Sequence, residues 1–267
     1  MTLFPIGLLI ALGSLAAAVI ALKQSAANFY DFVAFAVVLG GTVSVALIIL
    51  PWDLRREVLR AFQMLFYKRA TDSRAVVRTA LSMVQNPAAP HFEAGVPDLA
   101  TKILKDGSEL IQLGLAKERI DEILQERVFQ ASRRRRRVGT AIRNLAKYPP
   151  AFGLMGTVLG LVNLMRGLAS GLSAQQTGIE MAVALVATMY GLLLANLFIN
   201  PAGEMVMKKV TEDEDAADIA LQAVLLACDR VSVLEAQEVL NSYVDERHRI
   251  DVVSGIINHE GAEAQAA

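Results

Sequence analysis

Thr157 and Thr188 are the residues whose type and surroundings indicate chemistry inside a membrane. Both lie within long apolar stretches, on or beside stripes of small residues that allow two helices to approach closely. A threonine in a helix most often bonds a preceding carbonyl oxygen of its own helix. Two threonines on adjacent helices can instead offer neutral oxygens to a partly dehydrated cation, because hard cations prefer oxygen ligands. The residues alone leave both interpretations open.

The small-residue stripes predict close helix packing. Gly153, Gly156 and Gly160 form the first stripe, and Gly156 and Gly160 are a GxxxG pair. The second stripe recurs at helical spacing in the next apolar stretch and consists of Ala184, Ala187, Gly191 and Ala195. We expect these two stripes to bring their helices together.

Ionisable residues are missing from the deep positions of the apolar stretches, which contain no Asp, Glu, Lys or His. Asp31, Arg166 and Glu180 lie near the ends of the expected helices, where interfacial water accounts for them. If the protein moves ions, the titrating carboxylate must therefore belong to another chain. The His and Cys residues lack metal-ligand spacing, and no catalytic pair is visible in the spans. We expect no metal site, no cofactor other than a transported cation, and no enzyme activity.

Four apolar stretches must position these residues, and each is near the ~20 residues that a helix needs to cross a ~30 Å hydrocarbon layer. They run from Leu3 to Leu22, from Phe32 to Leu50, from Pro150 to about Ser170, and from Met181 to Ile199. Asn200 and Pro201 follow the fourth stretch, and we expect the helix to end there. The chain is 54% hydrophobic and 20% charged, which agrees with this pattern. The sequence therefore predicts an all-α polytopic membrane protein with four transmembrane helices and a helical cytoplasmic region.

Basic residues predict the orientation. Of the 26 lysines and arginines, 19 lie between the second and third spans and 5 in the tail, so both regions and both termini are expected in the cytoplasm. The expected segments are 1–52 (transmembrane helices 1 and 2), 53–148 (a cytoplasmic helical segment), 149–202 (transmembrane helices 3 and 4, the ion channel) and 203–267 (a cytoplasmic helical tail). The two outer loops, residues 23–31 and roughly 171–180, are short.

Charge is segregated between the two cytoplasmic regions. The central segment has 19 basic and 11 acidic residues, whereas the tail has 5 and 14. Opposite charges can dock the two regions onto each other or onto neighbouring subunits, and solvated, screened surfaces are the alternative. The run from Arg133 to Arg137 is the strongest local feature. Ahead of a membrane span, such a run is typical of a topology signal that meets anionic lipid, so we do not expect nucleic-acid binding.

The third and fourth spans carry motifs that resemble a known family. They read Pro150-Ala-Phe-Gly-Leu-Met-Gly-Thr157, with Gly160 following, and Met181-Ala-Val-Ala-Leu-Val-Ala-Thr188-Met-Tyr-Gly191 through Asn196 to Pro201. With Asp31 and Gly40-Gly41-Thr42, this pattern is similar to the A subunit of bacterial flagellar stators, the MotA/PomA family of the MotA/TolQ/ExbB superfamily.

The resemblance implies an ion-driven torque generator of the bacterial inner membrane that drives flagellar motility. In that family, a homopentamer of A subunits surrounds two B subunits. Each B subunit has one transmembrane helix with an ion-binding Asp and a peptidoglycan-binding domain, which agrees with the missing acid here. The A subunit's cytoplasmic part acts on a rotor protein of the flagellar switch complex.

The resemblance also implies roles for individual residues. Pro150 and Pro201 match prolines that couple ion passage to movement of the cytoplasmic part. Thr157 and Thr188 match threonines that line the ion path in the sodium-driven branch, so sodium is favoured over protons. Asn196 matches an asparagine near the inner end of span four, and we expect it to contact the partner. Asp31 matches an outer-loop acid whose expected role is contact with the partner near the channel mouth.

One region departs from the family pattern. Flagellar stators usually carry an Arg-x-x-Gly-x-Leu-x-Leu-Glu-like stretch early in the cytoplasmic segment. Here residues 86–95 lack its arginine, and Glu93 replaces it poorly. The rotor-contact residues, and whether the load is a flagellar rotor, are therefore not decided by the sequence. A TolQ/ExbB-like energiser of an outer-membrane process, a motor with a non-flagellar load and a helix-bundle scaffold remain the alternatives.

Overall fold

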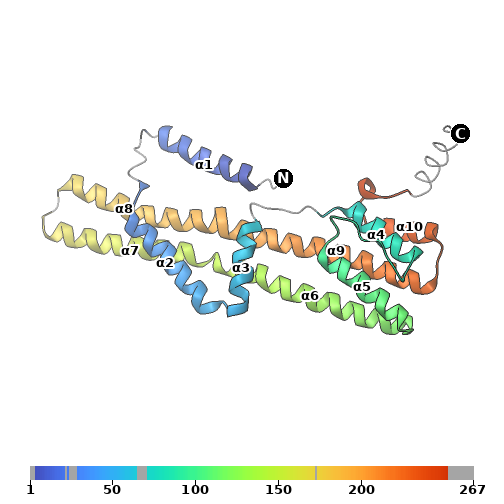
Figure 1. Ribbon diagram of the computed structural model, residues 1–267. Coiled ribbons are helices and arrows are strands. Elements are labelled where there is room, and N and C mark those ends of the chain that lie inside the picture. The colour runs from blue at the N-terminus through green and yellow to red at the C-terminus, as the bar shows by residue number, and fades with distance from the viewer. Residues whose placement is uncertain (1–3, 22, 24–28, 65–70, 172, 252–267) are drawn as a thin grey trace. The chain divides into compact units, whose positions relative to one another are not determined.

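The computed structural model describes residues 4–21, 23, 29–64, 71–171 and 173–251. Every regular element in these ranges is a helix, which confirms the expected all-α class (Figure 1). In chain order the elements are α1 (Phe4–Ala21), α2 (Phe32–Ile49), α3 (Trp52–Met64), α4 (Ser73–Gln85), α5 (Asp98–Gln112), α6 (Lys117–Leu145), α7 (Tyr148–Ala169), α8 (Ala174–Leu193), η2 (Leu194–Ile199), α9 (Asn200–Asp229), α10 (Val233–Asn241) and η3 (Glu246–His248).

Four helical stretches in the described residues are long and apolar enough to cross a membrane, as predicted. The first two are α1 and α2, and the other two are apolar parts of the longer stretches Lys117–Ala169 and Ala174–Asp229. Many large apolar side chains on α7 remain exposed, such as Leu154 and Leu159. Exposed apolar surface of this extent indicates contact with hydrocarbon or with partner helices.

The connection between α7 and α8 is shorter than the predicted loop of residues 171–180, because α8 already begins at Ala174. Gly171 adopts a φ of 93°, a left-handed conformation that suits the end of α7. Ser173 Oγ accepts a hydrogen bond from Gln176 N at 3.3 Å, and Gln176 Oε1 accepts one from Ser173 N at 3.2 Å. This capping box satisfies backbone N–H groups at the helix start. The polar residues of the expected loop are therefore the first turns of α8.

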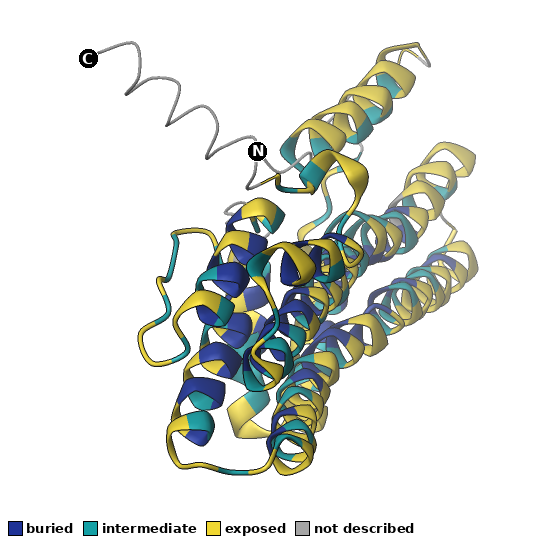
Figure 2. Cartoon of the chain, turned by 90° about the vertical axis from the view of Figure 1, so that its right-hand side faces the viewer, coloured by how far each residue is buried: buried dark blue, intermediate teal, exposed yellow. Residues whose placement is uncertain are grey.

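The helices form two compact units. The first comprises residues 1–68 and 136–207, and the second comprises residues 69–135 and 208–267. Each unit thus combines stretches that are far apart in the sequence, and the long helices α6 and α9 contribute residues to both. Burial follows one side of most helices, with buried residues in dark blue and exposed residues in yellow (Figure 2).

In the first unit, α7 packs along α8, and α2 packs against both (Figure 1). A hydrophobic cluster adds α3, with Val58 and Ala61 packed near Ile142 of α6 and Ala202 of α9. Arg55 connects α2 to α3, because its guanidinium donates to the carbonyl oxygens of Leu50 and Leu47 at 3.1 and 2.5 Å. These carbonyl groups would otherwise lack partners at the end of α2.

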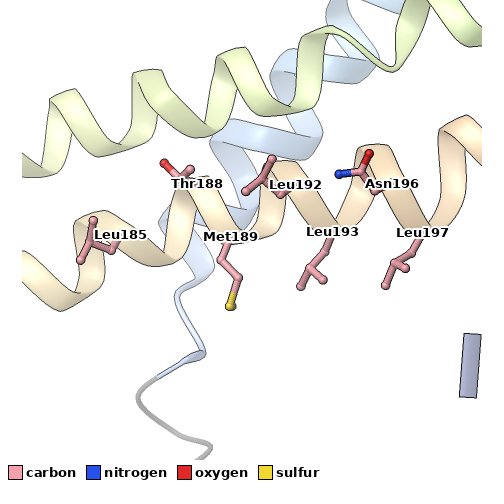
Figure 3. A pocket seen from close by; sticks show the side chains of 7 residues that line it. All are labelled: Leu185, Thr188, Met189, Leu192, Leu193, Asn196 and Leu197. Carbon is pink, nitrogen blue, oxygen red and sulfur yellow. The ribbon is translucent and has the colours of Figure 1, made fainter. Parts of the chain in front are cut away.

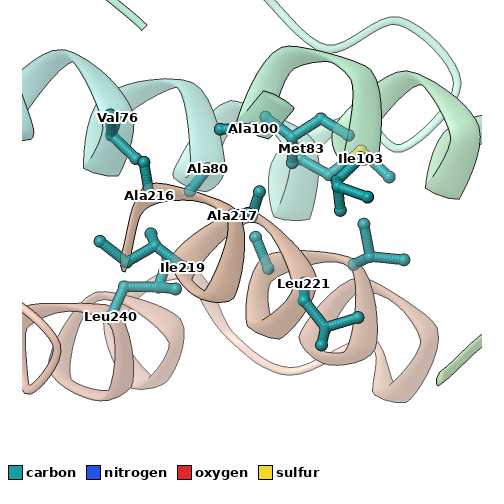
Figure 4. Close-up of a cluster of buried hydrophobic side chains, with 14 of the residues drawn as sticks. Val76, Ala80, Met83, Ala100, Ile103, Ala216, Ala217, Ile219, Leu221 and Leu240 are labelled. Atoms are coloured by element: carbon teal, nitrogen blue, oxygen red, sulfur yellow. The ribbon is translucent and has the colours of Figure 1, made fainter. Parts of the chain in front are cut away.

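The second unit has its own hydrophobic core, to which α4, α5, α6, α9 and α10 contribute (Figure 4). Ile120 and Leu124 of α6 and Val224 of α9 are buried in it, as their helical spacing predicts. A Cβ added at Gly107 of α5 would lie 2.8 Å from Val224 Cγ1, so these helices touch closely. Pro87, Pro90, Gly95 and Pro97 lie between these helices, and α4 accordingly ends at Gln85 and α5 starts at Asp98.

Ion pairs join α6 to α9 in the second unit. Lys117 pairs with Asp229, and Arg135 pairs with Asp213. Asp213 is only 3% exposed and also pairs with Lys209 at 3.0 Å, so this carboxylate is compensated by two cations. The basic central segment and the acidic tail therefore dock onto each other within one chain, which is one of the two arrangements that charge segregation allowed.

Candidate ion-pathway site

Three glycines bring α7 against α8 in the first unit. A Cβ added to Gly153 would lie 2.8 Å from the carbonyl oxygen of Ala187. At Gly156 it would lie 2.6 Å from Ala187 Cβ, and at Gly160 it would lie 2.5 Å from Ala184 Cβ. Ordinary van der Waals contacts begin near 3.4 Å, so a larger side chain at any of these positions pushes the helices apart. The two small-residue stripes therefore meet face to face.

Gly191 makes the same kind of contact at the beginning of α7. A Cβ added there would lie 2.9 Å from the carbonyl carbon of Pro149 and 3.0 Å from Pro150 Cα. Both prolines occupy the first turn of α7, where a helix does not need their missing N–H groups. Pro150, the first predicted coupling proline, thus lies directly against the glycine of α8.

Thr157 and Thr188 face each other across this helix contact. Their hydroxyl oxygens lie 2.5 Å apart, within hydrogen-bond distance. Thr157 Oγ1 is also 3.2 Å from the carbonyl oxygen of Gly153, one turn earlier in α7, and 3.2 Å from that of Ala184 in α8. The bond within the helix, the first of the two interpretations of the sequence, is therefore present, and the binding of a cation by these oxygens stays a prediction. Four oxygen atoms from two helices are therefore gathered at one point.

This oxygen cluster (the hydroxyl oxygens of Thr157 and Thr188 with the carbonyl oxygens of Gly153 and Ala184) has acceptor capacity to spare. Each hydroxyl carries one proton, and the carbonyl groups carry none. Two protons thus serve four oxygens, which leaves lone pairs without a proton from within the cluster. Neutral oxygens of this kind replace water around a hard cation.

The oxygen cluster lies far from the ends of its helices that carry Pro150 and Pro201. Thr157 is nine residues from Tyr148, the start of α7, which corresponds to about 14 Å along the axis. Thr188 is eleven residues before Ile199, the end of η2, which corresponds to about 17 Å. Both distances are near half of a ~30 Å hydrocarbon layer. A cation at this depth would have little access to bulk water.

A groove runs along the exposed side of α8 and η2, beside the oxygen cluster (Figure 3). Its lining residues are Leu185, Thr188, Met189, Leu192, Leu193, Asn196 and Leu197. Thr188 and Asn196 supply the polar side chains of this surface, and the others are apolar. Asn196 Oδ1 accepts a hydrogen bond from Asn200 Nδ2 at 3.2 Å, which orients the amide of this predicted partner-contact residue.

The helix widens where Asn196 lies. Leu194–Ile199 is a π-helix, and the N–H of Asn200 after it donates to the carbonyl oxygen of Ala195, five residues earlier. Pro201, the second predicted coupling proline, was expected to end the span. The helix instead continues as α9, because the wide turn accommodates a proline that cannot form the ordinary bond to the residue four positions earlier. Turns of this kind are frequent at functional sites, and Pro201 is their only signal in the sequence.

Asp31 caps the start of α2. Its carboxylate accepts hydrogen bonds from Val33 N at 2.8 Å and Ala34 N at 3.2 Å. Its backbone N–H donates to the Tyr190 hydroxyl at 3.2 Å, and that hydroxyl donates to the carbonyl oxygen of Phe29 at 2.5 Å. Tyr190 therefore ties the start of α2 to α8. The sequence interpretation missed this role, although a tyrosine within an apolar span signals a need for a polar partner. The contact of Asp31 with a partner subunit stays a prediction.

The candidate site has no titratable carboxylate of its own. The sequences of α2, α7 and η2 contain no acidic residue, and Glu180 lies in the second turn of α8, where Asn163 Nδ2 donates to it at 3.1 Å. In the described ranges, no group of three or more His, Cys, Asp and Glu side chains is placed to hold a metal ion. The oxygens of this site can coordinate a passing cation, but without a carboxylate they cannot neutralise the positive charge of that cation.

Comparison with known proteins agrees with this geometry. Residues 96–218 match the sequence model of the MotA/TolQ/ExbB proton channel family. Motility protein A of Bacillus subtilis (strain 168) is 24% identical over 237 residues, which cover 87% of this chain and 84% of that protein. Motility protein A of Borreliella burgdorferi is 33% identical over 121 residues, 45% of each chain. The uncharacterized protein YtxD of Bacillus subtilis is 28% identical over 191 residues, 70% of this chain and 68% of that protein.

Two solved structures share the fold. The structure of C. jejuni MotAB aligns with a TM-score of 0.77 at 15% identity, over 94% of this chain and 99% of that chain. The flagellar MotAB stator complex from Bacillus subtilis aligns with a TM-score of 0.75 at 19% identity, over 91% and 96%. The matched family is one of channel proteins, not enzymes, in agreement with the expected lack of enzyme activity. Over residues 96–218 this chain is thus similar in sequence to the MotA/TolQ/ExbB proton channel family, and its fold is that of the two MotAB structures.

Proposed function

We propose that this chain is the A subunit of an ion-driven rotary stator. It conducts cations together with a B subunit and converts the ion gradient into torque for flagellar motility. The relatives named motility protein A and the MotAB folds support this assignment. The observation that carries it is the oxygen cluster, which lies deep in an apolar helix pair that has no acid at that depth.

In the proposed mechanism, the partner supplies the missing charge. A helix of the B subunit lies along the groove of α8 and η2 and carries an Asp that binds the cation. Thr157 and Thr188 then take the place of water molecules around the ion, because their oxygens have lone pairs to spare. Release of the cation to the cytoplasm lets the ring of A subunits step around the B helices.

The two prolines transmit this step to the cytoplasmic helices. Pro150 lies against Gly191, so a shift of α8 acts directly on the start of α7. Pro201 follows the π-helix, whose weaker hydrogen bonding makes that turn of the fourth span easier to distort. Movement at both points reaches α6 and α9, which continue into the second unit.

We further propose the inner membrane of a bacterium as the location, with both termini in the cytoplasm. The lysine and arginine distribution supports this orientation. The proposed assembly is five copies around two B subunits that also carry a peptidoglycan-binding domain, and the load is a rotor protein of the flagellar switch complex. Sodium is the proposed cation, because two neutral hydroxyl groups suit a metal cation better than a proton.

Isosteric replacement of the threonines tests the proposal. Thr157→Val and Thr188→Val keep the side-chain shape and remove one oxygen each. We expect either change to lower sodium flux at least about tenfold, since a lost polar contact to a charged group is worth ~1.5–3 kcal/mol. The measurement is ion flux in membranes that contain the full chain and a candidate B subunit.

Thr177→Val is the matched control, because within the described residues the Thr177 hydroxyl bonds the carbonyl oxygen of Ser173 alone, at 3.0 Å, near the start of α8. It should leave flux unchanged. Unaltered flux and ion preference in both Thr157→Val and Thr188→Val would remove the oxygen cluster from the mechanism. If the chain is purely a structural scaffold, the wild-type complex carries no flux, and neither variant changes it.

A further inference from the structure

Among the described residues, the charges that perturb two carboxylates of α9, Asp215 and Asp218, all belong to acids. Asp215 and Asp218 are exposed, and in the described part of the chain no cation forms an ion pair with either. Desolvation by the surrounding protein raises the pKa of Asp218, and the charges of Asp215 and Glu214 raise it further. The pKa of Asp215 is raised in the same way, by desolvation and then by Glu214 and Glu212. Within a single chain, the negative charges of these carboxylates and of their acidic neighbours therefore repel one another.

A complementary face lies on α6. Arg133 is exposed and makes no ion pair with any other described residue of its chain. Phe129, one turn earlier, is 57% exposed although α6 is a polar helix. An exposed aromatic ring next to an arginine is typical of protein interfaces. We call Phe129 and Arg133 the basic face, and Asp215 and Asp218 the acidic face.

Within one chain, the basic face and the acidic face lie at the same position along the length of the α6–α9 helix pair. Arg135 of α6 pairs with Asp213 of α9, and Lys117 pairs with Asp229, so the two helices are antiparallel and keep this register. Arg133, two residues before Arg135, is therefore level with Asp215, two residues after Asp213. Two helical residues correspond to about 200° of rotation, so Arg133 points away from the α9 helix of its own chain.

Copies in one membrane are related by rotation about the membrane normal, which keeps equivalent residues at equal depth. Arg133 and Asp215 are level within each copy, so they are also level between neighbouring copies when the α6–α9 pair runs parallel to the rotation axis. We infer that the basic face of each copy docks onto the acidic face of a second copy of this chain. The inference rests on the proposed assembly of several A subunits and does not depend on the oxygen cluster.

Disulfide cross-linking between differently tagged chains tests this interface. In a Cys228→Ser background, chains with Arg133→Cys and chains with Asp215→Cys are co-expressed in membranes and oxidised. Each chain then has one thiol, so a disulfide joins two copies. We expect a product that carries both tags. Arg119→Cys, another exposed arginine of α6 that lies about four turns away, should give no product with Asp215→Cys.

Charge exchange gives a second readout, the mass of the solubilised full chain. Arg133→Glu should weaken association by about two- to fivefold per contact, and Arg133→Glu with Asp215→Arg in the same chain should restore it. Assembly without the two-tag product overturns the inference, and so does a product that joins Asp215→Cys to a different protein. Loss of ion flux with the two-tag product intact supports the interface and counts against the proposed function alone.

Discussion

Replacing Gly156 by alanine tests whether close contact between α7 and α8 holds the oxygen cluster together. The added Cβ meets one atom within 4 Å, the Cβ of Ala187 at 2.6 Å, where ordinary contacts begin at 3.4 Å. The helices must therefore separate locally by about 0.8 Å, the difference between these two distances. Thr157 and Thr188 are the next residues on each helix, so their oxygens move from 2.5 Å to about 3.3 Å apart, beyond the normal range of an O–H···O hydrogen bond.

The expected change in stability follows from two opposing terms. Overpacking costs ~1–3 kcal/mol, and alanine is favoured over glycine within a helix by ~1 kcal/mol. We expect Gly156→Ala to be destabilised by up to about 2 kcal/mol and to lose most of its ion flux. Ala187→Gly removes the one atom that the new Cβ meets, so the double variant should regain both stability and flux.

The assay combines thermal unfolding of the solubilised full chain with ion flux in the presence of a B subunit. Gly178→Ala is the control, because a Cβ at this position of α8 meets nothing within 4 Å. It should leave flux unchanged and should not lower stability. Wild-type flux in Gly156→Ala, or no recovery in the double variant, would refute the idea that this contact sets the distance between the two hydroxyl groups.

Two further changes test groups outside the oxygen cluster. Asp31→Ala should lower the stability of the protein by ~1 kcal/mol, because it removes the N-cap of α2. Asp31→Asn keeps a capping oxygen and should lower the stability less. Thermal unfolding measures both losses, and equal losses would contradict the capping role. Burial raises the pKa of the Cys228 thiol, Asp229 raises it further and Lys117 lowers it, so alkylation at neutral pH should be slower than that of an exposed thiol and should accelerate with rising pH. Asp229→Asn should lower this pKa and speed alkylation, and an unchanged pH profile would argue against the electrostatic contribution.

Much of the architecture follows directly from the order of the residues. Membrane helices need long apolar runs, so four such runs predicted four spans. The glycine stripe at Gly153, Gly156 and Gly160 also predicted where α7 is approached closely, because only a missing Cβ permits such contact.

Other features were not predictable, because they depend on hydrogen-bond partners that are far apart in the chain. Gln176 converts an expected loop into the capped start of α8, and the proline expected to end a helix follows a π-helical turn instead. Tyr190 bonds to Phe29 and Asp31 from more than 150 residues away. No local pattern encodes such pairs.

The sequence by itself determined that this protein is an all-helical membrane protein with neutral oxygens and no acid at depth, because runs of about 20 apolar residues cross hydrocarbon as helices and hydrocarbon penalises every buried charge. Only the tertiary structure decided that Thr157 and Thr188 share one hydrogen bond, and that Arg135 rather than its neighbours meets Asp213. Hydropathy sets the depth of a residue along a helix. The rotation of that helix, and thus the partner of each side chain, depends on how glycine, alanine and charged side chains pack between helices.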